Sequence, residues 1–303
     1  MTESSDFWDF YWEMRLQPLQ NLGKRAAILA ASRLIRQMSQ PPGRPVRLLE
    51  LGCGEGQIIG ALVDGHAQVT AIQESVGVDY LAAAIETCRR AYPGMRFIVG
   101  DFTDAALLAA LGQFQVVLLV NALHEVYSAA YSEPLGEVDV TLAKERVARA
   151  FAGAAERVAP GGYLLLFDGL EPPGDPRQKI RLRFLTRQAR EHFETFVRQY
   201  RPFRISPRAL GSPNRVELSR RDFTRYITKS IFLGKALWQT ERYESYQYYN
   251  ENEFRAAFAR AGLTIRELRT LTVDDEKWRR TVAIESPGES FPEEHILIIG
   301  QKD

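Results

Sequence analysis

The stretch VRLLELGCGEG, residues 46–56, decides the fold class. Its first half is short and apolar, and its second half places glycines at alternate positions. This pattern is typical of a buried strand that enters a tight turn. Because Gly52, Gly54 and Gly56 carry no side chains, a ligand can lie directly against the backbone there. The spacing is GxGxG rather than the GxGxxG of dinucleotide-binding proteins, and no GK[ST] follows, so the turn fits a ligand without a pyrophosphate.

Apolar strand patterns alternate with helical patterns from this stretch onward. Alternation of this kind predicts a parallel sheet that is covered by helices on both faces. Two further strand patterns close the chain. We expect strands at 46–51, 96–99, 114–120, 163–167, 263–271 and 295–299, and a further strand that ends with residues 77–79. We expect helices at 56–64, 80–92, 105–111, 138–158, 177–200, 219–238 and 250–261.

Acidic residues follow the next two strands. Asp79 lies 27 residues beyond Gly52, at the carboxyl end of a strand, where a carboxylate can accept bonds from both hydroxyls of a ribose. Asp101 and Phe102 end the third strand and offer an acceptor for an exocyclic amine and an aromatic face for an adenine ring. The strand ends therefore converge on one crevice that suits a nucleoside.

Five motifs together resemble one enzyme family. LLELGCGEG, VGVDY, VGDFTD, VVLLVNALHEV and RVAPGGYLLL, in this order and spacing, are similar to the class I S-adenosylmethionine-dependent methyltransferases. The resemblance covers residues 46–170, and LTIRELRTLTV and HILIIGQKD resemble the last two strands of that family. It implies a seven-stranded, mostly parallel Rossmann-like sheet with an antiparallel last strand, S-adenosylmethionine as cofactor, and methyl transfer as the reaction.

The resemblance also implies roles for single residues. The glycines would line the methionine and ribose portion of the cofactor, Glu50 would help to orient it, and Asp79 would hold the ribose. Asp101 and Phe102 would hold the adenine, and Asn121 would contact the amino-acid end. The expected cofactor-binding residues are Glu50, Gly52, Gly54, Gly56, Asp79, Tyr80, Asp101, Phe102 and Asn121.

His124 is the candidate catalytic residue. The segment Leu123-His124-Glu125 resembles the one that carries the base in a group of O-methyltransferases, although that group has an aspartate where this chain has Glu125. A histidine with a pKa near neutrality could take a hydroxyl proton as the methyl group arrives. The alternative is a structural histidine that only forms hydrogen bonds.

The expected organisation has four parts. Residues 1–45 form an N-terminal helical arm, 46–170 the cofactor-binding core, 171–250 a basic helical cap on the substrate side, and 251–303 the end of the core. The aromatic residues of the arm could close over the cofactor or simply fasten a helix to the core. Candidate residues of the acceptor pocket are Tyr11 and Trp12 in the arm and Tyr246 and Tyr249 after the cap.

The cap is strongly basic. Residues 171–230 hold fifteen Lys and Arg against six Asp and Glu, a net charge of +9 in a chain whose total is +1. This excess has three explanations, namely a solvated helix face, a pocket for an anionic small molecule, or a nucleic-acid surface. Nucleic acid is the least favoured, because no RNA-binding module accompanies the patch.

Composition limits the remaining possibilities. The chain is 45% hydrophobic and 25% charged, has no membrane-length apolar stretch, and starts with polar and acidic residues. Its two cysteines show no metal-ligand spacing, and we expect reduced thiols and a cytoplasmic location. We therefore expect methylation of a small-molecule acceptor, with O-methylation by His124 as one form. The alternatives are an N-, C- or RNA methyltransferase, a non-catalytic binding protein, and a nicotinamide-dependent enzyme. The sequence leaves the acceptor and the oligomeric state open.

Overall fold

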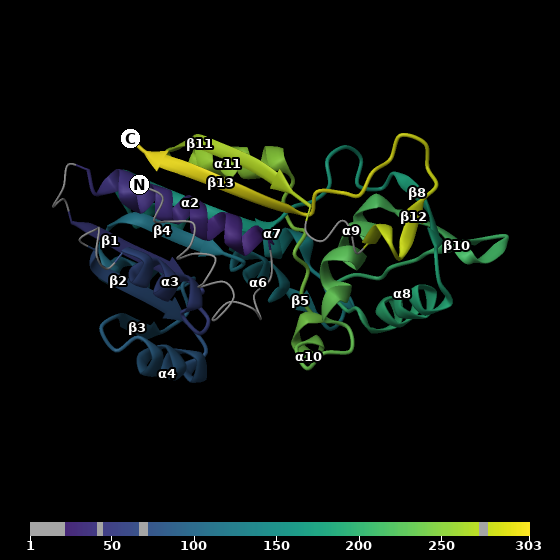
Figure 1. Cartoon of the computed structure of the whole chain (residues 1–303), viewed down its shortest axis with the longest axis horizontal. Helices are drawn as coiled ribbons and strands as arrows, with labels where there is room; N and C mark the ends of the chain where they lie inside the picture. Colours follow the sequence, from purple (N-terminus) through teal and green to yellow (C-terminus); the bar gives the residue numbers. More distant parts are fainter. Residues whose placement is uncertain (1–21, 41–44, 67–71, 273–277) are drawn as a thin grey trace.

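The structure is a computed structural model of the 303-residue chain. It describes residues 22–40, 45–66, 72–272 and 278–303. A sheet-based core makes up one end of the molecule, and a smaller cap with its own sheet makes up the other (Figure 1).

The core is built on one sheet of seven strands in the order β11-β13-β7-β4-β1-β2-β3. Six strands are parallel, and β13 is antiparallel to both of its neighbours. This confirms the predicted fold class, including the antiparallel last strand. The strands are β1 (Val46–Leu51), β2 (Ile72–Asp79), β3 (Arg96–Val99), β4 (Phe114–Val120), β7 (Val158–Gly169), β11 (Leu263–Leu271) and β13 (His295–Lys302).

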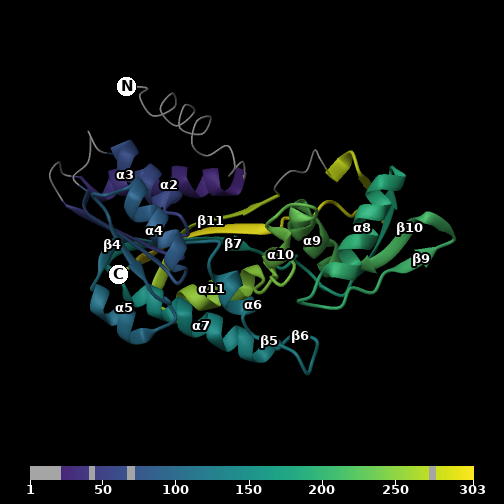
Figure 2. The same cartoon turned by 90° about the horizontal axis from the view of Figure 1, so that it is seen from below.

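Helices cover both faces of this sheet (Figure 2). One face carries α2 (Leu22–Met38), α3 (Gln57–His66) and α4 (Ala82–Ala91), and the other carries α5 (Ala105–Leu111), α7 (Val140–Glu156) and α11 (Glu251–Arg260). Strand β4 shows why both faces need a cover. Its sequence FQVVLLV is almost wholly buried, and successive side chains point to opposite faces. Val117 therefore packs in the cluster under α5 and α7, whereas its neighbour Leu118 packs in the cluster under α2 and α3.

Side-chain hydrogen bonds at the N-terminal ends of α9 (Arg220–Lys229) and α11 confirm where these two helices were predicted to start. Asn250 forms a capping box with Glu253 at the start of α11, with the Glu253 amide donating to Oδ1 of Asn250 over 3.0 Å. Ser219 caps α9 by accepting from the Asp222 amide over 3.0 Å. Each cap satisfies an amide at the helix start that has no partner within the helix.

The N-terminal arm is described only in part. Its helical pattern is confirmed by α2, which packs against β4 and β7. Tyr11 and Trp12, the two candidate pocket residues of the arm, lie outside the described residues.

The cap is not the helical insertion that we expected. It contains an antiparallel sheet in the order β12-β8-β10-β9. The alternation of strand β8 explains the error, because Ile180 and Leu182 are buried while Lys179 and Arg181 are exposed, a period of two that suits a strand. The expected helix at 177–200 begins only at Arg187. The cap elements are β8 (Lys179–Phe184), β9 (Arg208–Leu210), β10 (Ser212–Ser219), β12 (Val282–Ile284), α8 (Arg187–Gln199), α9, the 3-10 helix η2 (Ser230–Phe232) and α10 (Trp238–Glu241).

The expected domain boundaries also need correction. Strand β12 lies between β11 and β13 in the sequence, inside the range 251–303 that we assigned to the core, yet it pairs with β8 of the cap. The chain therefore enters the cap twice.

Three short elements follow β4 and were not predicted. They are helix α6 (Leu123–Ser128) and the antiparallel pair β5 (Tyr131–Ser132) and β6 (Glu137–Val138). In the described part of the chain, no helix combines the length and the apolar character that crossing a bilayer requires.

Candidate active site

The glycine turn after β1 has the backbone that only glycine adopts easily. Gly52, Gly54 and Gly56 have φ angles of 75°, 52° and 74°. A Cβ at Gly52 would lie 2.7 Å from Cβ of Ala122, whereas a Cβ at Gly54 would meet nothing within 4 Å. Gly52 thus serves close packing between two strand ends, and the Gly54 face is open to a ligand.

Two carboxylates hold this turn in place. Oδ2 of Asp79 accepts from the Gly54 amide over 2.8 Å, and Oδ1 accepts from the Leu81 amide over 2.9 Å. The Glu50 side chain is buried and accepts from the Ile59 amide in the first turn of α3 over 3.0 Å. Burial raises the pKa of Glu50 to about 8. Glu50 therefore orients the helix behind the turn, and Asp79 reaches the turn itself.

A cavity of about 940 Å³ opens beside this turn. Tyr80, Asp101 and Phe102 line one side, at the carboxyl ends of β2 and β3, and Ala122 and Glu125 line another. The Phe102 side chain is buried, and Oδ1 of Asp101 accepts from the Thr103 amide over 2.8 Å. The cavity thus offers an aromatic face beside a carboxylate, which is what an adenine ring with an exocyclic amine requires.

Asn121 is unusual in its backbone and its side chain. It is the non-glycine residue with a positive φ, 52°, among the described residues, and its buried Oδ1 has no hydrogen-bond partner there. Its amide donates to the Phe167 carbonyl over 2.7 Å. A buried acceptor without a partner at the end of a strand is a position where a bound ligand could donate a hydrogen bond.

His124 lies at the start of α6 between two carboxylates. Its Nδ1 is 2.7 Å from Oδ1 of Asp168, and its Nε2 is 3.7 Å from Oε2 of Glu244. Oδ2 of Asp168 also accepts from the amides of Leu123 and His124 over 3.0 and 3.2 Å. Burial lowers the pKa of His124, but the two carboxylates outweigh burial and raise the pKa to about 9. The ring is therefore protonated at neutral pH.

The cap supplies the next charges of this network. Lys229 is fully buried and forms ion pairs with Glu241 and with Glu244, the latter over 3.1 Å. Burial acts to raise the pKa of Glu244, but His124 and Lys229 lower it to about 2. The Tyr246 ring lies between these groups, with its centroid 3.8 Å from that of His124 and 4.0 Å from Nζ of Lys229. Charges from core and cap thus form one continuous cluster.

Backbone contacts fasten the cap to this cluster. Ser128 Oγ donates to the His124 carbonyl over 2.7 Å and accepts from the Ser245 amide over 2.9 Å. The backbone at Gly169 lies so close to the backbone at Tyr246 that a Cβ at Gly169 would lie 2.2 Å from the Tyr246 carbonyl oxygen. The segment 244–247 is therefore held at the carboxyl end of β7.

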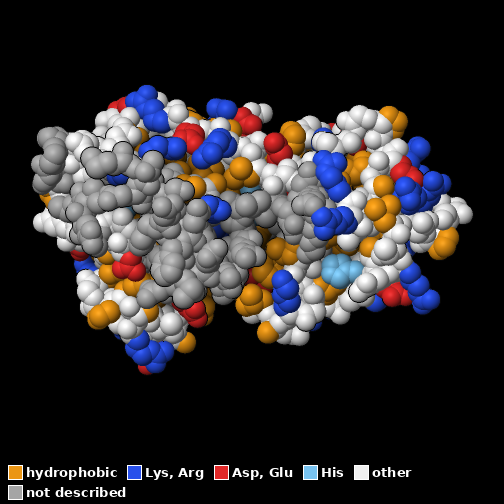
Figure 3. All heavy atoms as spheres, viewed as in Figure 1, with side chains coloured by type: hydrophobic (Ala, Val, Ile, Leu, Met, Phe, Trp, Pro, Cys, Tyr) orange, Lys and Arg blue, Asp and Glu red, His pale blue; other side chains and the backbone are white. Residues whose placement is uncertain are grey.

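The basic residues of the cap are mostly engaged in ion pairs. Glu285, from beyond β11, contacts Arg183 and Arg215, each over 3.0 Å. Glu217 contacts Arg208 over 2.7 Å and Arg181 over 3.6 Å. In Figure 3, Lys and Arg side chains stand beside Asp and Glu on the cap end of the molecule. Acids from outside 171–230 thus offset part of its positive charge, which favours the solvated-face explanation.

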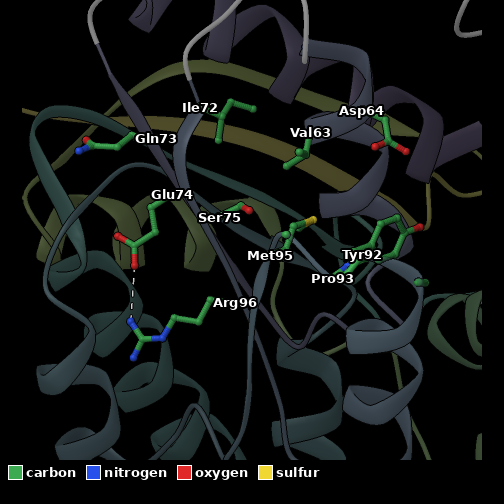
Figure 4. A pocket seen from close by; sticks show the side chains of 12 residues that line it. Val63, Asp64, Ile72, Gln73, Glu74, Ser75, Tyr92, Pro93, Met95 and Arg96 are labelled. Atoms are coloured by element: carbon green, nitrogen blue, oxygen red, sulfur yellow. Dashed lines mark hydrogen bonds and ion pairs between the residues drawn. The ribbon is translucent and has the colours of Figure 1, made fainter.

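A second cavity, of about 470 Å³, lies at the opposite edge of the sheet (Figure 4). The amino ends of β2 and β3 line it, with Glu74 and Arg96 3.5 Å apart on its wall. None of the residues that line it belongs to the predicted site, so we exclude it from the candidate active site.

Comparison with protein families gives a direct match to this part of the chain. Residues 48–145 match the family model described as a methyltransferase domain. This range contains the glycine turn, Asp79, Asp101, Asn121 and His124. This part of the chain is a methyltransferase domain. Its cofactor is accordingly S-adenosylmethionine. No curated protein matches the chain.

Solved structures of methyltransferases are similar in shape at low identity. An S-adenosylmethionine-dependent methyltransferase from Mesorhizobium loti has 16% identity and a TM-score of 0.47, with 91% of this chain and 98% of that one covered. N-methyltransferase NodS from Bradyrhizobium japonicum, in complex with S-adenosylhomocysteine, has 11% identity and a TM-score of 0.45, with 93% and 89% covered. An O-methyltransferase family protein from Burkholderia thailandensis has 15% identity and a TM-score of 0.44; 92% of this chain matches 58% of that one. The present methyltransferase thus spans little more than half of the Burkholderia protein, and likenesses this weak carry no functional argument.

The structure brings most of the predicted site residues together. In this methyltransferase Tyr246 reaches the site by packing on His124. Tyr249 does not, because it packs against Phe254 of α11 and its hydroxyl donates to the Lys144 carbonyl of α7 over 3.3 Å. We therefore correct the placement of Tyr249 in the acceptor pocket.

Sequence reasoning missed Asp168, Lys229 and Glu244. Asp168 directly follows the fifth apolar strand pattern, so the rule that identified Asp79 and Asp101 would have found it. Lys229 and Glu244 carry no local signal, because only the packing of the cap against the methyltransferase core brings them to His124.

Proposed function

We propose that this methyltransferase acts on a small-molecule acceptor, which binds beyond the carboxyl ends of β4 and β7 where core and cap meet. One observation supports the proposal above others: the cluster of His124, Tyr246, Lys229 and Glu244 joins the cap to the strand end next to the cofactor turn. On this proposal residues 46–170 bind the cofactor, and the cap supplies the acceptor side. The free cysteines Cys53 and Cys88 are in keeping with a cytoplasmic setting.

The residues present fit the cofactor. In the proposed arrangement the open face of Gly54 and the adjacent glycines lie along the methionine and ribose portion, and the Asp79 carboxylate accepts from the ribose hydroxyls. Tyr80, Asp101 and Phe102 surround the adenine, and Oδ1 of Asn121 gains a donor at the amino-acid end. When bound, S-adenosylmethionine supplies a methyl group activated by its sulfonium charge.

The protein's own contribution to this transfer is alignment and exclusion of water. The reaction is an in-line displacement, for which a fixed orientation of the acceptor supplies much of the rate increase. In the proposed site the aromatic side chain of Tyr246 and the ion-paired cap segment around it would lie on the acceptor side.

O-methylation with His124 as general base is a second candidate. It is favoured by the 2.7 Å contact with Asp168, which fixes the orientation of the ring as acid–base catalysis requires. Because the pKa of His124 is about 9, this candidate predicts a rate on a hydroxyl acceptor that rises with pH up to about 9. A His124→Ala variant with near-normal turnover at every pH would exclude it.

Calorimetric titration with S-adenosylhomocysteine tests the proposed cofactor site. We expect micromolar binding by the wild type, loss of binding in Asp79→Ala, and unchanged binding in Asp175→Ala, whose carboxylate is exposed on the cap. No binding by a folded wild type would contradict the proposal. Binding without methyl transfer to any acceptor class would instead favour a non-catalytic methyltransferase-like protein.

A further inference from the structure

The acceptor side of the site is rich in carboxylates. They come from four strand ends, from helix α6 and from the cap, and they lie close enough to act on one another electrostatically. The cations that reach the same region are fewer. The carboxylates are Glu50, Asp79, Asp101, Glu125, Asp168, Glu241 and Glu244, with Glu156 of α7 also on the cavity wall. The cations are Lys24, His124 and Lys229, together with Arg146 and Arg149 of α7, which line the cavity.

Most of these cations already interact with carboxylates of the protein. His124 lies between Asp168 and Glu244, and fully buried Lys229 lies between Glu241 and Glu244. Lys24, at the start of α2, faces Glu50, Glu125 and Glu241 at once. Each of these three cations therefore faces at least two carboxylates. Even with Glu50 left out, because its pKa is about 8, seven carboxylates stand against five cations, and the region keeps a negative balance.

Glu125 differs from the other acids in having no direct partner. Within the part of the chain that the structure describes, no hydrogen bond or ion pair engages its carboxylate. It lines the 940 Å³ cavity with Tyr80 and Phe102, and it follows His124 directly in the chain. Its carboxylate thus stands between the cofactor side of the site and the cluster that joins the cap.

We propose that the acceptor is a primary or secondary amine that enters as a cation and places its ammonium group against Glu125. This inference rests on the proposed methyltransferase function and specifies its substrate class. A site with excess negative charge attracts a cation and repels an anion, and the partner-free carboxylate supplies a charge-assisted hydrogen bond for the ammonium group.

The chemistry requires a proton acceptor at this position. The ammonium group gives one proton to the Glu125 carboxylate, which frees the nitrogen lone pair. The lone pair forms the new C–N bond while the bond between the methyl carbon and sulfur breaks, and that electron pair stays on sulfur as a neutral thioether. The methylated amine leaves with a positive charge, and Glu125 passes its proton to water.

The surroundings tune Glu125 for this role. Glu125 is solvent-exposed, but partial desolvation of its carboxyl in the cavity raises its pKa to about 7; His124 opposes the rise, and Glu244, Asp79 and Asp168 add to it. Other groups that face it are Lys24, Tyr80 and Tyr246. Glu125 therefore becomes able to accept a proton as the pH rises through about 7, whereas His124 does so only near 9.

The basic composition of the cap raised the alternative hypothesis of an anionic acceptor. The ion pairs in the structure make this hypothesis less favourable. Six arginines of the cap on which this alternative depends are already paired with Glu171, Glu217, Glu285 and Glu289. An anion in the site itself would face more carboxylates than cations, although Arg146 and Arg149 also line the cavity.

Matched probes test the substrate class. The full chain, saturated with S-adenosylhomocysteine, is titrated with 2-phenylethylamine, N-methylbenzylamine, spermidine and tyramine, and with alcohols and carboxylates of the corresponding skeletons. We expect amines to bind more tightly than their matched alcohols and carboxylates. Tighter binding of alcohols or carboxylates would overturn the inference, and so would the absence of amine binding at millimolar concentration.

Variants of Glu125 assign the effect to one carboxylate. In Glu125→Gln we expect amine binding to weaken about 10- to 100-fold, the range for one charge-assisted hydrogen bond. Glu125→Asp should restore part of it, and Glu137→Gln, which changes an exposed glutamate on β6, should leave it unchanged. Unaltered amine binding in Glu125→Gln would contradict the inference. Loss of S-adenosylhomocysteine binding in the wild type would instead overturn the proposed function, so the two failures can be told apart.

For an accepted amine, the pH profile of turnover gives a readout that a structural role would not move. We expect the rate to rise through about pH 7 in the wild type and to lose this inflection in Glu125→Gln. An inflection near 9 that disappears in His124→Ala would assign the base to His124 and overturn the role of Glu125.

Discussion

The cap and the crevice of the core both carry many charges, but they carry them in different surroundings. On the cap, Arg208 and Arg215 keep 69% and 48% of their side chains exposed while they pair with glutamates. In the crevice, His124 and Asp168 are 2% and 1% exposed. Exposed pairs contribute about 0–1 kcal/mol, because water and salt screen them. Removal of one partner from a buried pair costs about 3–5 kcal/mol, because it leaves a charge without compensation. Loss of one charged side chain on the cap should therefore change stability little. Loss of one from the buried cluster at the strand ends should be costly.

Removal of Asp168 should have the largest effect. In Asp168→Ala the buried His124 loses its nearest carboxylate, and the amides of Leu123 and His124 lose their acceptor. We expect the free energy of unfolding to fall by about 3–5 kcal/mol in urea titration. A fall below about 1 kcal/mol, equal to that of an exposed cap pair, would show that the two regions do not differ in the way argued above.

Alkaline pH should weaken the core through His124. Its pKa is raised by folding from 6.5 to about 9, so its contribution is complete below pH 6.5 and is lost as the pH rises through 9. The full contribution is up to roughly 3 kcal/mol at about 1.36 kcal/mol per pKa unit. The free energy of unfolding, measured from about pH 6 to about pH 10, should fall accordingly in the wild type and less in His124→Gln.

The cap should respond at the other end of the pH scale. Arg208 beside Glu217 lowers the pKa of that carboxyl, so its contribution is present above the ordinary glutamate pKa and is lost as the pH falls. Glu217→Gln should therefore lower stability slightly at neutral and alkaline pH, and should have no effect under acid conditions, where the wild type has already lost this contribution. A loss of stability in this variant that persists under acid conditions would contradict the contrast between the two regions.

Substitution of two glycines distinguishes the effect of backbone strain from the effect of lost ligand contact. Gly54 in the turn and Gly174 in the cap have φ angles of 52° and 80°, and a Cβ at either would meet nothing within 4 Å. Alanine at either position should cost about 1–2 kcal/mol from its left-handed backbone. Only Gly54→Ala should also lose binding of S-adenosylhomocysteine in calorimetry. Equal affinity in both variants would show that the open face of Gly54 is not the cofactor contact.

The smallest effect should come from the arginines of the cap. Arg215→Ala removes one of the two contacts to Glu285, and Arg183 remains to hold that carboxylate. We expect a change below about 1 kcal/mol in urea titration, reduced further by added salt. A larger loss would mean that these exposed pairs act as a coupled network.

The sequence predicted those features that depend on neighbours in the chain. Local periodicity predicts the strand at 114–120 and the helix at 105–111, and capping chemistry predicts the helix start at Asn250. All three are confirmed. The carboxylates at strand ends follow from the topology of a parallel sheet, and Asp168 could have been found by that rule. The cluster of Lys229 and Glu244 could not, because its partners lie on another part of the molecule. The prediction of one helix over 177–200 was wrong because strand β8 is followed at once by the strongly amphipathic helix α8. The apolar positions of α8 at helical spacing hid the alternation of buried and exposed residues in β8.

Strand β12 has a consequence for how this enzyme could have diversified. Because the chain visits the cap on two separate occasions, no single contiguous segment encodes it. An exchange of residues 171–250 for those of another methyltransferase would leave β12 without its hydrogen-bonded partner β8. Exchange of the whole cap by recombination or engineering therefore requires two coordinated junctions.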